Sequence, residues 1–188
     1  MQIMENQITL HDKIFRPFIP YQEIEKAIDA VADRLNRDFA SATEEDAPVF
    51  LCTLNGAVMF AAELLKRIQF PCIFKAAKMS SYVGTNSTGV VQGDLAAGFN
   101  FTGKRVLVVE DIVDTGNTIV AITRQLRQLG AQEVKVCTLL LKPDVYDKDV
   151  KLDYVALEIP NRFIVGFGLD YDDLGRNTKD IYVLDDQI

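Results

Sequence analysis

Short apolar runs alternate with segments of helical periodicity along most of this chain, after a polar lead that precedes residue 21. Residues 49–54 and 106–109 carry no charge and are rich in bulky or β-branched side chains, which predicts buried strands. Apolar side chains recur at helical spacing in residues 21–39 and again in residues 117–129, which predicts two amphipathic helices. This alternation predicts an α/β fold with a mainly parallel sheet and helices on both of its faces.

The same pattern predicts further elements. Asn55 and Gly56 signal a turn after the first apolar run, and residues 57–68 are predicted as a helix. Gly130 is expected to end the helix at 117–129 as a left-handed cap. Residues 80–93 are rich in serine, threonine, asparagine and glycine, which predicts a long mobile loop. Additional strands are predicted at residues 73–78, 134–141, 154–157, 163–169 and 181–184.

The composition favours an ordinary globular domain. Of 188 residues, 48% are hydrophobic and 25% charged, so the chain can bury a core without disulfides or metals and is predicted to form one domain. The formal net charge of −7 argues against a nucleic-acid partner, because such surfaces use lysine and arginine to displace counterions from phosphates. The longest apolar region, residues 49–65, is interrupted by polar residues, so we expect no membrane partner.

The three cysteines indicate a reducing compartment. Cys52, Cys72 and Cys137 stand singly among apolar residues without a CxxC pair, so neither a zinc site nor a disulfide framework is expected. Residues 1–12 lack the basic start and apolar stretch of a signal peptide. These features predict a cytoplasmic protein with buried thiols.

An acidic bend follows the run at 106–109. It contains three carboxylates, Glu110, Asp111 and Asp114, and continues into Thr115 and Gly116 at the predicted start of a helix. Backbone amides and hydroxyls at a helix start favour a phosphate, whereas carboxylates suit sugar hydroxyls, a hydrated divalent cation or a proton transfer. The acids alone could simply cap the helix, but three in five residues exceed that need. A sugar phosphate would satisfy both halves of the bend.

The segment VLVVEDIVDTGNT at residues 106–118 resembles the phosphoribosyl pyrophosphate motif of type I phosphoribosyltransferases. The chain from about residue 15 to residue 184 resembles the hypoxanthine-guanine branch of that family. The resemblance implies the type I fold, a mainly parallel twisted sheet flanked by helices, with a core at about 15–160. It also implies a flexible loop and a small hood built from the N-terminus and residues 161–188.

The resemblance assigns roles to the acidic bend. Glu110 and Asp111 would hold the ribose hydroxyls, partly through Mg²⁺, and Asp114 would be the general base or acid at purine N7. The bend from Asp114 onward would cradle the 5′-phosphate. The substrate-binding residues implied for this segment are Glu110, Asp111, Ile112, Val113, Thr115, Gly116, Asn117 and Thr118.

The resemblance also assigns residues outside the bend. Lys142 would contact the purine 6-oxo group, Phe163 would stack on the purine, and the backbone of Ile164 would read its edge. Asp170 would bind a second Mg²⁺, and Arg176 would contact pyrophosphate. The pyrophosphate loop would be Leu54, Asn55 and Gly56, and the flexible loop would begin with Ser81 and Tyr82.

Two positions depart from the family pattern, since Asn55 replaces a basic residue and Asn177 stands where an acid is frequent. Taken alone, Phe163 could be a core residue, and Lys142, Asp170 and Arg176 could be surface charges. Three other functions compete: a related enzyme that prefers xanthine, a phosphoribosyl-pyrophosphate-sensing regulator that binds RNA or DNA, and a magnesium-binding phosphoacceptor domain. The resemblance favours an enzyme that uses phosphoribosyl pyrophosphate and a purine base, assembled as a homodimer or homotetramer.

Overall fold

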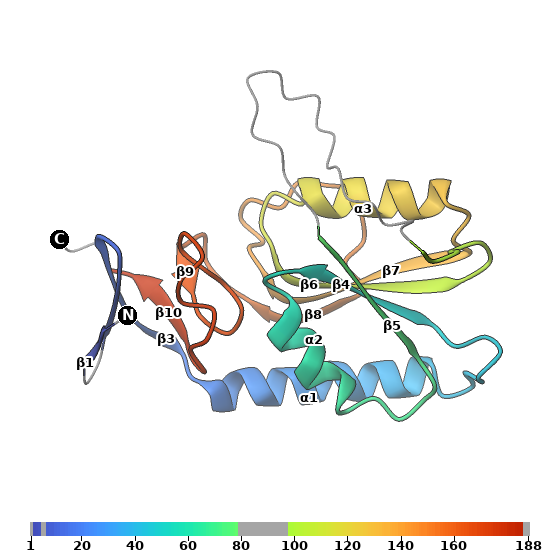
Figure 1. Cartoon of the computed structure of the whole chain (residues 1–188), viewed down its shortest axis with the longest axis horizontal. Coiled ribbons are helices and arrows are strands. Elements are labelled where there is room, and N and C mark those ends of the chain that lie inside the picture. The colour runs from blue at the N-terminus through green and yellow to red at the C-terminus, as the bar shows by residue number, and fades with distance from the viewer. Residues whose placement is uncertain (1, 5–6, 79–97, 186–188) are drawn as a thin grey trace, which may run out of the picture.

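Two sheets organise the chain in the computed structural model, which describes residues 2–4, 7–78 and 98–185 (Figure 1). The first is a five-stranded sheet in the order β5-β4-β6-β7-β8, in which all neighbours are parallel. Its strands are β4 (Val49–Leu54), β5 (Ile73–Lys78), β6 (Arg105–Val113), β7 (Glu133–Leu141) and β8 (Tyr154–Glu158). The predicted parallel α/β sheet is therefore confirmed.

Helices cover both faces of the parallel sheet. Helices α1 (Tyr21–Asp38) and α2 (Val58–Leu65) lie on one face, and α3 (Asn117–Gln128) lies on the other (Figure 1). Side chains of β6 alternate between the two resulting cores: Leu107 and Val109 pack with α1 and α2. Val106 and Val108 pack with α3. This alternation explains why residues 106–109 of β6 form an unbroken apolar run, since both faces of the strand are buried there.

The second sheet brings the two ends of the chain together. It has the order β1-β2-β3-β10-β9, and all its neighbours are antiparallel. Its strands are β1 (Gln2–Met4), β2 (Gln7–Leu10), β3 (Lys13–Ile19), β9 (Ile164–Val165) and β10 (Ile181–Leu184). It lies beside the start of α1, at one end of the parallel sheet (Figure 1).

Several predicted boundaries are wrong. The polar lead forms strands β1 to β3, and β6 continues to Val113, so Glu110 and Asp111 lie inside a strand and not in a bend. The strand predicted at 163–169 is only Ile164–Val165, because Gly166, Phe167 and Gly168 all have positive φ and turn the chain. The loop predicted at 80–93, with Ser81 and Tyr82, falls outside the described residues.

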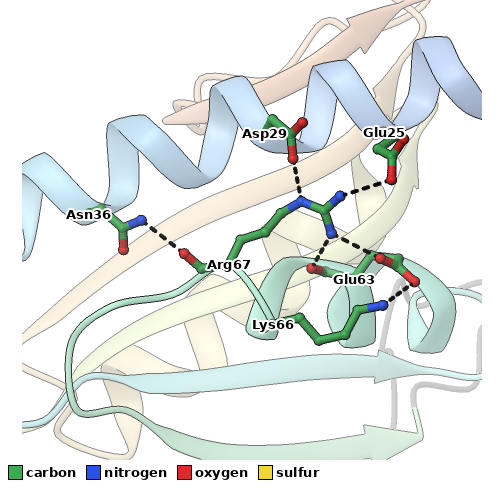
Figure 2. A network of polar contacts seen from close by, with 6 residues as sticks. All are labelled: Glu25, Asp29, Asn36, Glu63, Lys66 and Arg67. Carbon is green, nitrogen blue, oxygen red and sulfur yellow. Dashed lines mark hydrogen bonds and ion pairs between the residues drawn. The ribbon is translucent and has the colours of Figure 1, made fainter.

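An ionic network fastens α2 to α1 (Figure 2). The Arg67 guanidinium forms ion pairs with Glu63 at 2.9 Å, with Glu25 at 3.5 Å and with Asp29. The Asn36 side chain donates a hydrogen bond to the Arg67 carbonyl at 2.9 Å. These contacts hold the end of α2, whose start follows the turn at Asn55 and Gly56.

Within the described ranges, no helix has both the length and the apolar character needed to cross a membrane.

Candidate functional site

The predicted site residues gather where the parallel strands end. Gly56 follows β4, Asp114 follows β6 and Lys142 follows β7. Because these strands are parallel, their carboxyl ends share one edge of the sheet, the place where α/β proteins bind ligands.

Glu110 is a buried carboxyl group in β6, with only 8% of its surface exposed. The Thr53 hydroxyl donates a hydrogen bond to Glu110 Oε1 at 2.9 Å. The other oxygen, Oε2, is buried and accepts no hydrogen bond from any described residue. Burial raises the pKa of Glu110 well above its usual value, and the negative charge of Asp111 raises it further. This carboxylate therefore lacks a partner that a cation or a hydroxyl group would supply.

Asp111 lies beside Glu110 and supports the turn after β4. Its Oδ1 accepts a hydrogen bond from the Ile112 amide at 2.8 Å. Burial raises the pKa of Asp111, while the positive charge of Arg176 acts in the opposite direction. A Cβ atom at Gly56 would lie 1.6 Å from Asp111 Oδ2, so any larger residue there would displace the Asp111 carboxylate. The Leu54–Asn55 peptide before it is cis.

The acid pair suits a hard cation. Mg²⁺ prefers oxygen ligands and is commonly held by one or two carboxylates together with water and substrate phosphates. No group of three or more histidine, cysteine, aspartate or glutamate side chains is arranged around a metal site in the described part of the chain. Glu110 and Asp111 thus fit a cation that is shared with a bound substrate.

Asp114 and Lys142 meet at the ends of β6 and β7. Lys142 Nζ lies 3.0 Å from Asp114 Oδ2. The lysine side chain is 9% exposed, whereas the aspartate side chain is 49% exposed. The Lys142 amide also donates to the Val113 carbonyl at 3.0 Å, which extends the strand pairing to this point. A largely buried ammonium group therefore stands behind an accessible carboxylate.

The backbone at the start of α3 is closely packed and has no side-chain cap. Gly116 precedes the helix with a φ of 80°, and in the described structure no side chain caps the first turn. A Cβ atom at Gly116 would lie 2.4 Å from a ring carbon of Tyr146 and 3.0 Å from Lys148 Cγ. Uncapped amides at a helix start carry partial positive charge and favour an anion such as phosphate.

Phe163 lies just before β9 of the second sheet, and its aromatic ring is partly exposed to solvent. Its surface is 44% exposed, which is high for phenylalanine. Phe15 packs at a centroid distance of 5.9 Å, and Tyr171 meets the ring edge-to-face at 5.7 Å. Ile164 follows in β9. An aromatic ring supported from behind and open elsewhere is suited to stacking on a flat ligand.

Comparison with known proteins identifies the family. Residues 20–172 match the family model described as a phosphoribosyl transferase domain. The chain belongs to the phosphoribosyltransferase family. It is 36% identical over 170 residues to the hypoxanthine-guanine phosphoribosyltransferase of Mycobacterium tuberculosis, covering 89% of this chain and 84% of the relative.

Further relatives agree over nearly the whole length. The Streptococcus pneumoniae hypoxanthine-guanine phosphoribosyltransferase is 34% identical over 180 residues, covering 95% of this chain and 98% of that one. The crystal structure of a hypoxanthine phosphoribosyltransferase from Staphylococcus aureus matches with a TM-score of 0.82 and 33% identity, over 90% of this chain and 91% of that one. The predicted family and type I fold are confirmed.

In this phosphoribosyltransferase, the predicted residues Asp170 and Arg176 contact each other. Asp170 Oδ1 forms an ion pair with Arg176 at 2.7 Å, and Asp170 Oδ2 accepts a hydrogen bond from the Asp173 amide at 2.9 Å. Arg176 also donates to the Gly168 carbonyl at 2.8 Å. Both oxygens of the predicted second metal ligand are therefore engaged by the protein. Ser81 and Tyr82 are not described.

Three neighbours of the site are not among the predicted residues. Thr53 contacts Glu110, and Tyr146 and Lys148 pack against Gly116. For Thr53 the available signal is a lone hydroxyl in the otherwise apolar segment VFLCTL. Tyr146 and Lys148 follow a strand and approach the helix start only in three dimensions, so local sequence does not indicate them.

Proposed function

We propose that this chain is a hypoxanthine-guanine phosphoribosyltransferase of purine salvage. It transfers the 5-phosphoribosyl group from phosphoribosyl pyrophosphate to N9 of hypoxanthine or guanine, which yields IMP or GMP and pyrophosphate. The names of the relatives support this assignment. The observation that carries it is the acid pair Glu110 and Asp111 in β6, which is followed closely along the chain by the uncapped start of α3 at Asn117.

Glu110 and Asp111 hold the ribose hydroxyls. The unpartnered Glu110 Oε2 supports this role, because a buried acceptor without a donor is costly until a ligand supplies one. Mg²⁺ bound by this pair and by the substrate would neutralise charge on the leaving pyrophosphate. The two carboxylates also favour the positive charge that develops on the ribose as the bond at C1′ breaks.

The 5′-phosphate binds at the start of α3. Thr115 and Thr118 supply hydroxyls, and the backbone around Gly116 and Asn117 supplies amides. Ile112 and Val113 carry the strand up to this cradle. The tight contact of Gly116 with Tyr146 supports the role, because it fixes the backbone on which the amides depend.

Asp114 and Lys142 act on the purine. Asp114 accepts the N7 proton as N9 attacks, and its accessible carboxylate supports this role. An ammonium group has three N–H donors and no acceptor, so Lys142 can hold Asp114 and still donate to a 6-oxo group. The same group cannot accept a hydrogen bond from the 6-amino group of adenine. Phe163 stacks on the base, and the Ile164 backbone reads its edge.

The pyrophosphate group is bound at the turn after β4. Leu54, Asn55 and Gly56 supply backbone contacts, and Arg176 supplies positive charge. Asp170, whose oxygens contact Arg176 and the Asp173 amide, would hold a second Mg²⁺. Ser81 and Tyr82 belong to the loop that excludes water from the reaction centre.

We also propose one domain composed of a core and a hood, an assembly of two or four copies, and a cytoplasmic location. The free thiols of Cys52, Cys72 and Cys137 support a reducing compartment.

A steady-state assay tests the activity. Purified protein would receive phosphoribosyl pyrophosphate and hypoxanthine, guanine, xanthine or adenine, each with Mg²⁺ and with EDTA. We expect IMP and GMP to form only with Mg²⁺. A preference for adenine would contradict the role of Lys142, and a preference for xanthine would identify the related enzyme.

A further inference from the structure

Thr53 presents a buried hydroxyl to the acid pair. The residue is 4% exposed and lies near the end of β4, one position beyond the paired residues Cys52 and Val109. Continuing this parallel register brings Thr53 alongside Glu110 on the neighbouring strand. The contact is therefore set by the pairing of two central strands and not by a loop.

The hydroxyl lies between two acceptors. Thr53 Oγ1 is 3.0 Å from the Val109 carbonyl oxygen and 2.9 Å from Glu110 Oε1. Among the described residues, Thr53 is the only one that donates a hydrogen bond to Glu110 Oε1, and Oε2 accepts none. Because the hydroxyl has one proton, it donates to one of these acceptors at a time, and the Glu110 carboxyl group is held at Oε1 while Oε2 has no partner.

We propose that Thr53 is a positioning residue, which orients the Glu110 carboxylate toward the ribose hydroxyls of the substrate. The proposal rests on the ribose-binding role of Glu110 proposed above. A glutamate side chain has three rotatable bonds, and a hydrogen bond to one oxygen restricts where the other one lies. Thr53 itself does not touch the substrate.

A set of variants tests the proposal by binding. Thr53→Val keeps the shape of the side chain and removes the donor, whereas Thr53→Ser keeps the donor. The affinity for GMP would be measured by isothermal titration calorimetry, together with the melting temperature. We expect Thr53→Val to weaken GMP binding by about twofold to tenfold, because the unrestrained Glu110 side chain must then become ordered when the nucleotide binds. Thr53→Ser should restore most of the affinity.

The ligand supplies a second control. The 2′,3′-dideoxy analogue of GMP lacks the hydroxyls that Glu110 would hold. Its affinity should be the same in the wild type and in Thr53→Val. An equal loss for both nucleotides would overturn the proposal, because the effect would then not pass through the ribose hydroxyls.

A double-mutant cycle with Glu110→Ala separates positioning from general support. In the Glu110→Ala background, Thr53→Val should have little further effect on GMP affinity. The same loss in both backgrounds would overturn the proposal. The matched control is Thr123→Val, a buried threonine in α3 whose hydroxyl donates to the Ile119 carbonyl at 2.8 Å, and it should retain wild-type affinity.

The cycle also distinguishes the ribose-binding role of Glu110 from the positioning role of Thr53. If Glu110→Ala binds GMP normally, the ribose role of Glu110 is wrong and the role of Thr53 is wrong with it. If Glu110→Ala loses affinity while Thr53→Val does not, only the positioning role is wrong. Should Thr53→Val not fold, Thr53→Ala takes its place with the same expected outcomes.

Discussion

Gly168 packs directly against Gly56. A Cβ atom at Gly168 would lie 2.0 Å from the Gly56 carbonyl oxygen, and Gly168 has a φ of 101°. Gly56 in turn leaves no room for a Cβ beside Asp111 Oδ2. Gly168, in the segment after β9, therefore packs on Gly56, and Gly56, in the turn after β4, packs on Asp111.

This packing predicts that Gly168→Ala displaces the turn at Gly56. We expect the KM for phosphoribosyl pyrophosphate to rise by about tenfold or more, because small displacements at a reacting centre are costly. The matched control is Gly103→Ala, which has a similar φ of 71° but open space around the added methyl group. An equal rise in KM in both variants would mean that backbone strain, and not contact with Gly56, causes the effect.

The Asp114–Lys142 pair predicts a selective loss of turnover in Asp114→Asn. The amide cannot accept the N7 proton, so kcat should fall by about a hundredfold to ten-thousandfold. GMP binding should change far less, because the 5′-phosphate is held by backbone amides. Turnover and calorimetry on the same preparation check this, and wild-type turnover would remove Asp114 from the mechanism.

Much of the fold is predictable because local pattern and burial agree. The bounds predicted for strands β4, β5 and β10 are those of the structure, since each is a short, mainly apolar segment, although β5 (IFKAAK) carries two lysines. The end of β6 is not predictable in this way. Glu110 pairs with Thr138, and Ile112 with Leu140, so the long neighbour β7 keeps the acids in a strand that their charge disfavours.

Contacts between distant parts of the chain also escape a local pattern. Helix α1 begins after Pro20 without a side-chain cap of its own. The Tyr21 amide donates instead to Asp180 Oδ1 at 2.7 Å, across 159 residues of sequence. The sequence around Tyr21 does not indicate Asp180 as its partner, because only the folded chain brings the two residues together.

The Asp180 contact predicts a loss of stability in Asp180→Ala. Replacing a residue that caps a helix amide costs about 0.5–2 kcal/mol of the free energy of unfolding. Urea denaturation measures this directly. The comparison variant is Asp33→Ala on the exposed side of α1, which should change the free energy of unfolding by less than about 0.5 kcal/mol. Equal losses would show that Asp180 does not act as the cap.

The buried Glu110 predicts how stability depends on pH in protein freed of metal and nucleotide. Burial is the chief cause that raises the pKa of Glu110 well above the ordinary glutamate value of 4.5. Between the unfolded and folded pKa values the native state binds more protons than the unfolded state, so stability falls as pH rises through that window. The contribution is fully present below about pH 4.5 and is lost above the folded pKa.

Glu110→Gln removes this titration. In EDTA, the melting temperature of the variant should exceed that of the wild type more at pH 8 than at pH 5, because only the wild type must ionise a buried carboxyl group. Saturating GMP should then stabilise the wild type more than the variant, since the ribose hydroxyls supply the partner that Glu110 Oε2 lacks. A difference in melting temperature that does not change with pH would mean that Glu110 is already ionised at pH 5 in the free protein.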